Sequence, residues 1–231
     1  MIAVEKSAVL VHTIVLKEDL KYNGVILLTY SIEYPEFRSF YYRKSLVMVN
    51  NYYKMKALEY QKYCRNELYH MAVEEYKNSI KNNFPVHVFE AMVVYKLTDN
   101  TACVISLYFD KYEYTGGAHG NTVRYSETWN LQKARLIKLR ELFGCQLDYK
   151  AYIFRIAVEE IQKDSSIYFE NYEKLLVETF NENSFYCTPE GIIIYYQQYD
   201  IAPYSSGIRE FLIPYTHCVM NPSEMCLILK R

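Results

Sequence analysis

The N-terminal part of the chain contains two nearly continuous apolar stretches rich in β-branched residues, at positions 7–16 and 24–34. Such runs favour β-strands over helices. We expect the polar turn Lys17-Glu18-Asp19 to end the first strand and Pro35 to end the second. The short connection between them predicts that the two strands pair as a hairpin.

From Ser45 to Asn82 the apolar residues recur every three or four positions. This period predicts one long helix with a single buried stripe, ended by Asn82-Asn83-Phe84-Pro85. At about 1.5 Å per residue an unbroken helix would exceed roughly 50 Å, so we expect a kink or break. We assign the stripe to the core and not to a cofactor site; its members are Leu46, Val49, Tyr53, Ala57, Tyr60, Cys64, Leu68, Ala72, Tyr76 and Ile80.

Three further strands, at 86–97, 102–112 and 123–131, are predicted to form a meander. The turn-favouring pair Asp99-Asn100 joins the first two, and a glycine-rich stretch joins the last two. Alternation along the second strand places one set on a single face: Cys103, Ile105, Leu107 and Phe109. On the third strand the polar face carries Arg124, Ser126, Thr128 and Asn130.

The second half of the chain mixes short helices and short strands. In order, we expect a helical turn at Leu139–Phe143, a helix from the N-cap Asp148 to about Lys163, a helix from Asn171 to Phe180, a hairpin of 185–188 and 192–196, and a strand at Arg209–Ile213. The fold class is therefore α+β, an antiparallel sheet of meander and hairpins packed with one long helix and shorter ones. No linker divides the chain, so we expect one domain over 1–231, with possible sub-lobes 1–110 and 111–231.

The segment from Tyr112 to Thr122 holds three of the seven glycines, Gly116, Gly117 and Gly120. Glycine is used where φ is positive or where another group comes very close to the backbone. The segment lacks the Gly-Lys-Ser/Thr ending and the following helix of a phosphate loop. A nest of backbone N–H groups that binds an anion stays open as an alternative.

Charge and composition narrow the classes of partner. The net charge of -1 gives no basic excess for nucleic acid or for an anionic membrane surface. The 26 tyrosines suit half-buried strand faces and binding surfaces, and we favour strand faces for most of them.

The six cysteines form no C-x-x-C motif; they are Cys64, Cys103, Cys145, Cys187, Cys218 and Cys226. Three disulfides are possible, but the positions fall in helix, strand and tail alike, so we expect free thiols in a reducing compartment. The N-terminus has no signal-peptide pattern, and no run of about 18 apolar residues predicts a membrane span. As written, the chain is expected to be soluble and cytoplasmic.

His119 follows the pair Gly116-Gly117 by two positions and directly precedes Gly120. Two roles are open for its side chain. A general base would make a small hydrolase, with Asp110 or Tyr114 as its partner. A structural histidine that ties the loop to backbone is the interpretation we favour, because no nucleophile is fixed beside it. We find no metal-ligand spacing, no G-x-S-x-G elbow and no cofactor motif, so we expect neither metal nor cofactor.

The segments Tyr114–Asn121 and Tyr199–Gly207, the latter followed by Phe211–Tyr215, resemble the extracytoplasmic domain of RsiV-type anti-sigma factors. This domain also forms the non-catalytic N-terminal part of PdaC-type peptidoglycan deacetylases. The order of elements is similar from about Ser7 to Tyr215. The resemblance implies a binding module whose partner is a lysozyme-like protein or a cell-wall glycan, and an extracytoplasmic location.

The Ile201-Ala202-Pro203-Tyr204 loop is the best candidate contact surface. Proline stiffens it, and tyrosines offer large contact area at low entropy cost. The alternative to an exposed position is that the side chains of Tyr199 and Tyr204 pack inward at a corner of the sheet. We predict a non-enzymatic recognition or sensor module; a hydrolase around His119 or a protein that self-associates through tyrosine-rich edges are the other hypotheses. The predicted contact residues are Thr115, Gly116, Gly117, His119, Tyr199, Pro203, Tyr204, Ser205 and Gly207.

Overall fold

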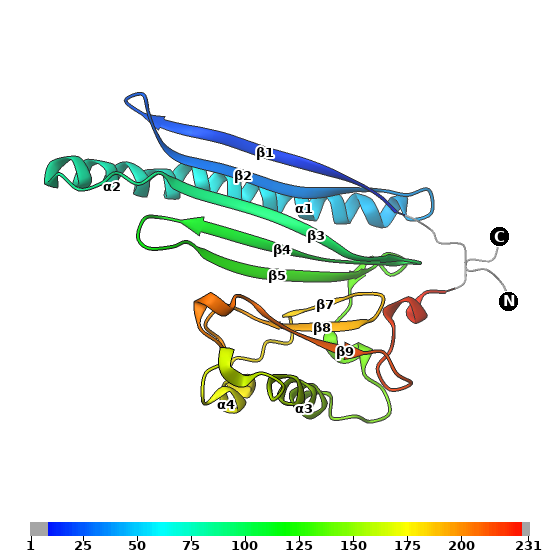
Figure 1. Ribbon diagram of the computed structural model, residues 1–231. Coiled ribbons are helices and arrows are strands. Elements are labelled where there is room, and N and C mark those ends of the chain that lie inside the picture. Colours follow the sequence, from blue (N-terminus) through cyan, green and yellow to red (C-terminus); the bar gives the residue numbers. More distant parts are fainter. Residues whose placement is uncertain (1–8, 228–231) are drawn as a thin grey trace. The chain divides into compact units, whose positions relative to one another are not determined.

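The computed structural model describes residues 9–227, and they form an α+β fold, as the sequence predicted (Figure 1). Six strands make one sheet in the order β1-β2-β3-β4-β5-β6, and three make a second in the order β7-β8-β9. The strands are β1 Leu10–Tyr22, β2 Val25–Arg38, β3 Phe89–Thr101, β4 Val104–Tyr114, β5 Asn121–Asn130, β6 Arg135–Leu136, β7 Phe185–Cys187, β8 Gly191–Tyr196 and β9 Arg209–Pro214. The helices are α1 Arg43–Tyr63, the π-helix η1 Cys64–Leu68, α2 Tyr69–Asn82, α3 Tyr149–Ile161, α4 Tyr172–Glu178, and the short 3₁₀ turns η2 Leu139–Leu142, η3 Ser165–Ile167, η4 Tyr204–Ser206 and η5 Pro222–Met225.

The chain divides into two compact units. One, which we call the helix unit, comprises residues 10–95 and 109–123; the other, the disulfide unit, comprises the described residues 9, 96–108 and 124–227. The chain passes from one unit to the other four times, whereas the predicted sub-lobes 1–110 and 111–231 would have met only once. Within residues 9–227, none of the helices combines the length and the apolar character of a membrane span.

The first hairpin is longer than the sequence predicted. Lys17, Glu18 and Asp19 do not turn the chain but lie inside β1, and the turn falls at Asn23-Gly24, where both φ angles are positive. The prediction was wrong because Glu18 has partners on the neighbouring elements: its carboxylate accepts from the Tyr30 hydroxyl at 2.7 Å and pairs with Arg65 at 2.7 Å.

Pro35 does not end β2, which continues to Arg38. The pairing of β2 with β3 ends at Ile32, so beyond that residue β2 has one unpaired side. A proline without an N–H group is tolerated where a strand has a free edge.

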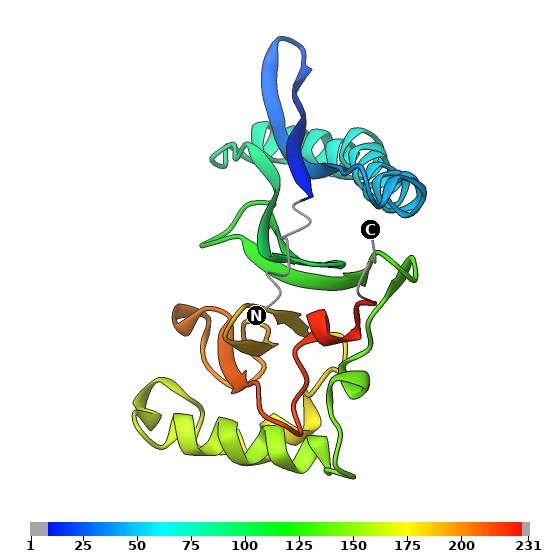
Figure 2. The same ribbon diagram turned by 90° about the vertical axis from the view of Figure 1, so that its right-hand side faces the viewer.

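The β2–β3 pair is parallel, which corrects the expectation of an antiparallel sheet. Parallel neighbours need a long connection, and the run α1–η1–α2 supplies it along one side of β2 (Figures 1 and 2). The pairings β1–β2, β5–β6, β7–β8 and β8–β9 are antiparallel.

A π-helical turn, Cys64–Leu68, interrupts the long α-helix. The sequence predicted a kink or break without a position, and the backbone stays helical on both sides of the turn. Most of the predicted stripe is buried, through Ala72. Ile80 was also assigned to the core, but it is 61% exposed while Ser79 is buried. Ala72 lies beyond the π turn and is still buried, so the stripe continues past the turn and shifts from Ile80 to Ser79 only near the end of α2. Asn83, in the left-handed conformation, ends α2 as predicted.

In the disulfide unit, the polar face predicted for β5 is covered by the second sheet. Ser106 of β4 and Thr128 of β5 are buried, and their hydroxyl oxygens lie 2.8 Å apart. The backbone N–H of Cys187 in β7 donates to Ser106 Oγ at 2.8 Å. The Ser106 hydroxyl thus provides a hydrogen-bond partner for a buried backbone N–H group of β7. The apolar face of α3, capped by Asp148 as predicted, packs with α4 and the β7–β9 sheet.

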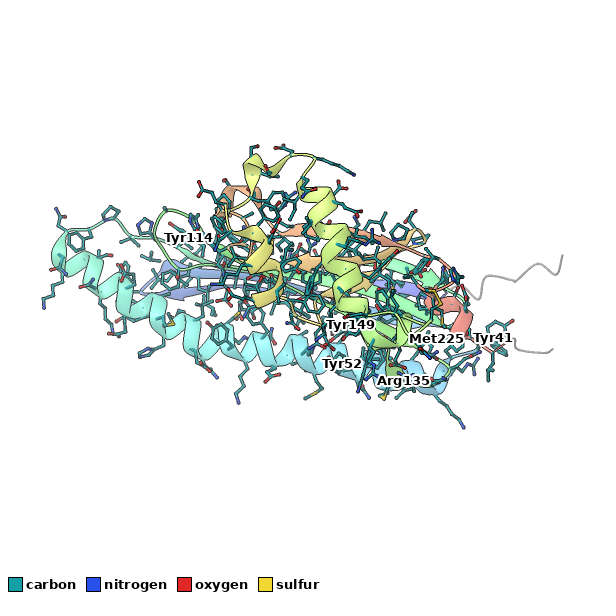
Figure 3. The ribbon with its side chains drawn as sticks, turned by 90° about the horizontal axis from the view of Figure 1, so that it is seen from below. Tyr41, Tyr52, Tyr114, Arg135, Tyr149 and Met225 are labelled. Carbon is teal, nitrogen blue, oxygen red and sulfur yellow. A yellow bond between two sulfur atoms is a disulfide. The ribbon has the colours of Figure 1, made fainter. Side chains whose placement is uncertain are left out.

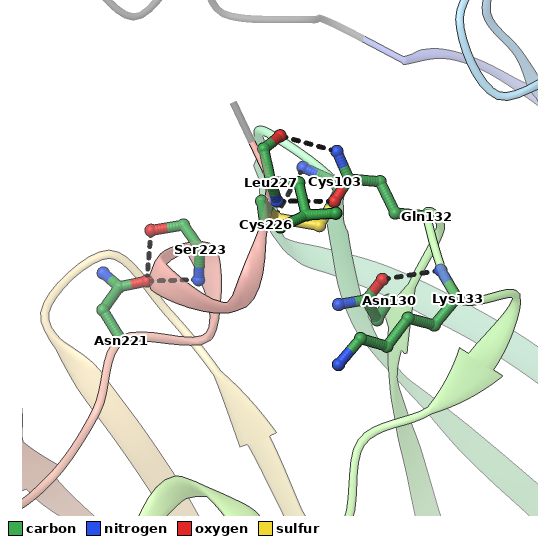
Figure 4. Close-up of a disulfide and its surroundings, with 8 residues drawn as sticks. All are labelled: Cys103, Asn130, Gln132, Lys133, Asn221, Ser223, Cys226 and Leu227. Carbon is green, nitrogen blue, oxygen red and sulfur yellow. Dashed lines mark hydrogen bonds between the residues drawn. A yellow bond between two sulfur atoms is a disulfide. The ribbon is translucent and has the colours of Figure 1, made fainter. Parts of the chain in front are cut away.

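Four of the six cysteines form disulfides, so the prediction of free thiols was wrong. Cys103 pairs with Cys226, with a Cα–Cα distance of 5.7 Å (Figure 4). Cys145 pairs with Cys218, with a Cα–Cα distance of 5.4 Å. Cys64 and Cys187 are free and buried. The pairs join residues 123 and 73 positions apart, and proximity over such distances is set by the fold and not by local sequence.

Candidate recognition loops

The glycine-rich loop between β4 and β5 uses its glycines for the two reasons that the sequence suggested. Gly116 and Gly117 have φ of +94° and +93°, a conformation that other residues rarely adopt. At Gly120 a Cβ atom would lie 2.3 Å from the ring of Tyr112. Glycine is therefore required at the tip of the loop because φ is positive there, and at Gly120 because the Tyr112 ring leaves no space for a side chain.

Two aromatic side chains hold the tip of this loop. The Tyr114 hydroxyl donates to the carbonyl oxygen of Gly117 at 3.1 Å and lies 3.2 Å from Nδ1 of His87. Figure 3 marks the position of Tyr114. The two rings are nearly perpendicular, with centroids 6.2 Å apart. Nothing in the local sequence connects His87 to Gly117, which lies 30 positions further along.

His119 and Thr115 are exposed on this loop. Nδ1 of His119 lies 3.0 Å from the carbonyl oxygen of Gly120, which is the backbone contact expected of a structural histidine. The Tyr114 hydroxyl, one of the partners considered for a general base, is engaged by Gly117 and His87.

A Gly120→Ala substitution is expected to destabilise the fold by about 1–2 kcal/mol, because the Tyr112 ring must move to admit the new methyl group. Thermal unfolding of the variant measures this loss. In a Tyr112→Ala background the same substitution is expected to have almost no effect. An equal loss in both backgrounds would show that the ring contact is not the reason for glycine.

The second predicted loop presents one tyrosine to solvent. Tyr199 is 55% exposed and has a φ of +69°, while Tyr204 is half-buried. Their ring centroids lie 5.9 Å apart. Tyr199 is therefore the more exposed of the two tyrosines. Ser205 is exposed, Pro203 is half-buried, and Gly207 takes a φ of +67° where the chain leaves the loop.

Buried residues and backbone hydrogen bonds fix this loop in place. Ile201 and Ala202 are fully buried, and the Ile201 carbonyl accepts from Phe169 N–H at 3.1 Å. The Ser206 hydroxyl donates to the carbonyl of Ile167 at 2.9 Å. The two tyrosines are therefore carried by a segment whose middle is part of the core.

An Asp200 carboxylate oxygen accepts from the N–H of Gln197 at 2.7 Å and closes the turn that holds Tyr199. Burial raises the pKa of Asp200 above its ordinary value, against the opposing effect of this hydrogen bond. Gln197 in turn is tied to β5: its side chain donates to the Arg124 carbonyl at 2.6 Å and accepts from the Arg124 N–H at 2.9 Å.

Arg124 is a supporting residue that sequence reasoning placed on a polar face but did not connect to the loop. Its side chain is only 9% exposed, forms an ion pair with Glu210, and places its guanidinium carbon 3.8 Å from the ring centroid of Tyr108. The Tyr186 hydroxyl also donates to Glu210, at 2.9 Å. Burial, reinforced by the Glu210 charge, raises the pKa of Tyr186.

The two predicted loops belong to different units: residues 114–120 to the helix unit, and residues 199–207 to the disulfide unit. The helix unit also has an open depression of about 600 Å³ lined by residues of β1, β2 and β3 together with Tyr112. The ligand atoms of Cys145, His217 and Cys218 lie within 4.8 Å of one another, but both sulfurs are used in the disulfide.

These features define an α+β module with an exposed, internally braced aromatic loop. Two family models match consecutive parts of the chain: the one described as deacetylase PdaC matches residues 25–122, and the one described as a protein of unknown function, DUF3298, matches residues 140–216. The first of these matches supports the PdaC side of the resemblance inferred from sequence.

Among curated proteins, the chain is similar to the peptidoglycan-N-acetylmuramic acid deacetylase PdaC of Bacillus subtilis, with 23% identity over 138 residues. The match covers 60% of this chain and 26% of the relative, so the chain spans about a quarter of the relative's length.

Two solved structures share the fold. A DUF3298 family member from Bacteroides fragilis has a TM-score of 0.72 and 20% identity, with 94% of this chain and 96% of that chain covered. A DUF3298 family protein from Pseudomonas aeruginosa has a TM-score of 0.59 and 15% identity, with 92% and 95% covered. At these identities the likeness concerns the fold.

Proposed function

We propose that this chain is a non-catalytic recognition module that binds a lysozyme-like protein at the cell envelope through the loop Tyr199–Gly207. The observation that carries the proposal is Tyr199 itself. It is a large side chain exposed to solvent on a left-handed backbone, a conformation that is unfavourable for tyrosine and is retained only when its surroundings enforce it. Such outliers concentrate at binding and catalytic positions.

The braced loop suits insertion into a partner's cleft. Tyrosine is enriched among residues that dominate binding energy, and ordering costs are low when the loop is already fixed. Here Asp200 and Gln197 fix the turn, and Ile201 and Ala202 anchor it in the core. Little conformational entropy would then be lost when a partner covers Tyr199.

The envelope location is supported by the disulfides and by the match to the PdaC family model at residues 25–122. Disulfides persist in oxidising compartments, outside the reducing cytosol, and the chain contains two. The similarity to a peptidoglycan deacetylase covers a quarter of that protein, and we assign this chain a binding role and not the deacetylation chemistry.

Calorimetric titration with a C-type lysozyme tests the proposal. Binding at micromolar affinity or better is expected, and Tyr199→Asn is expected to weaken it at least tenfold, which corresponds to about 1.4 kcal/mol. Asparagine is chosen because it tolerates a positive φ better than alanine does, so the loop keeps its shape. Tyr204→Ala is expected to weaken binding less, since that ring is half-buried behind Tyr199.

Tyr41→Asn is the matched control, because Tyr41 is also 55% exposed and lies in the helix unit. Equal losses for Tyr199 and Tyr41 would contradict a specific loop contact. If soluble peptidoglycan fragments release heat on titration and lysozyme does not, the partner is a glycan and not a protein. If neither releases heat, the proposed function is refuted.

A further inference from the structure

The two disulfides differ in the exposure of one cysteine each. Cys218 and Cys226 are both half-buried, but Cys145 is exposed whereas Cys103 in the other bridge is fully buried. Thiol–disulfide exchange requires an attacking thiolate to reach a sulfur atom, so access strongly affects its rate. An external thiolate can therefore approach the Cys145–Cys218 bridge from the exposed residue Cys145.

A histidine stands beside one sulfur of this bridge. Nε2 of His217 lies 3.2 Å from Sγ of Cys218. A protonated imidazole beside a cysteine lowers the pKa of the thiol and stabilises its thiolate, and a thiol of lower pKa leaves faster in exchange. The arrangement therefore makes Cys218 the leaving sulfur and Cys145 the sulfur that is attacked.

We propose that the Cys145–Cys218 bridge is a thiol–disulfide exchange site that accepts electrons from a dithiol. One thiolate of the dithiol attacks Cys145 Sγ, a mixed disulfide forms, and the Cys145–Cys218 bond breaks. Its electron pair goes to Cys218 Sγ beside His217. The second thiol of the dithiol then attacks the dithiol sulfur that is bonded to Cys145 Sγ. An intramolecular disulfide forms in the dithiol, and Cys145 is released as a thiolate. The dithiol loses two electrons and two protons, and Cys145 and Cys218 gain them as thiols.

The segments that carry the two cysteines stay joined when the bridge opens. The Gly144 N–H donates to the Cys218 carbonyl at 2.9 Å, and the Met220 N–H donates to the Leu142 carbonyl at 2.8 Å. The Thr216 hydroxyl accepts from the N–H groups of Cys218 and Val219 at 3.2 and 3.1 Å. These contacts keep the two sulfurs close together, so the bridge can close again without refolding.

Timed exposure of the native protein to dithiothreitol, with acid quenching and two-step isotopic alkylation, measures both bridges in the same molecule. Mass spectrometry is expected to show that Cys145–Cys218 opens at least tenfold faster than Cys103–Cys226. Circular dichroism should show that the fold persists after the first bridge has opened. Equal rates, or unfolding together with the opening of Cys145–Cys218, would overturn the proposal.

Glutathione, a monothiol, tests which sulfur is attacked. The adduct is expected on Cys145 and not on Cys218. His217→Ala is expected to slow the opening of Cys145–Cys218 several-fold while Cys103–Cys226 is unchanged; His217 is exposed, so this variant should fold normally. An adduct mainly on Cys218, or an unchanged rate in His217→Ala, would refute the assigned roles. These readouts involve no lysozyme and are independent of the function proposed above.

Discussion

A Cys103→Ala/Cys226→Ala variant is expected to lose about 2–4 kcal/mol of stability. The bridge joins residues 123 positions apart and attaches the C-terminal segment to the β3–β4 turn. Gln132 and Leu227 add two reciprocal hydrogen bonds of 2.8 and 2.7 Å beside it (Figure 4). Because these contacts form only when the segment is in place, we expect both to weaken when the bridge is removed. Denaturant unfolding with intrinsic tyrosine fluorescence measures the loss.

Cys145→Ala/Cys218→Ala is the control for that experiment. For bridges of 123 and 73 residues, the loop-length contributions differ by only about 0.5 kcal/mol. A larger difference between the two variants would come from local contacts, which remain around Cys218 through Gly144 and Met220. We expect the Cys103–Cys226 variant to be the less stable. The reverse order would show that the contacts around Cys218 do not compensate.

Gly191→Ala is expected to destabilise the protein by about 2–3 kcal/mol. A Cβ atom at this position would lie 2.4 Å from the backbone carbonyl oxygen of Ile213 in the neighbouring strand β9. A backbone atom in a paired strand cannot rotate away as a side chain can, so β8 and β9 must separate. Chemical denaturation of the variant gives the change in the free energy of unfolding.

Gly144→Ala provides the matched comparison. At Gly144 the nearest atom to a new Cβ is 4.0 Å away and φ is not positive, so we expect a change within about 0.5 kcal/mol. A similar loss at both glycines would mean that the close approach at Gly191 is not the cause.

Local patterns in the sequence predicted most elements of the fold. The three-to-four residue period identified the helix from Ser45, and its length indicated an interruption without giving its position, Cys64–Leu68. Asp148 identified the start of α3, and its side chain does accept from the N–H of Ala151. These features depend on residues close together in the chain, and their physical causes can be inferred from sequence.

Features that depend on distant residues could not be inferred in this way. Glu18 was taken for part of a turn because its partner Arg65 lies 47 positions away. The parallel pairing of β2 and β3 and both disulfides likewise arise from tertiary proximity. In the candidate site, glycines and tyrosines marked the two loops. The contacts of Gln197 with Arg124, which support the turn that holds Tyr199, join the residue after β8 to β5, and no local sequence pattern predicts a contact over that separation.

The fourfold passage of the chain between its two units has a consequence for how such proteins can be recombined. The PdaC-type match at 25–122 takes residues 96–108 with it, and these belong to the disulfide unit. The DUF3298-type match at 140–216 contains neither Ser106, which accepts the Cys187 N–H, nor the Cys103–Cys226 bridge. The boundaries of the two family matches therefore differ from the boundaries of the two compact units. A gene fusion that exchanged residues 25–122 as a cassette would cut β5 near its start and remove residues 96–108 from the disulfide unit, so the two matched segments are best engineered as one piece.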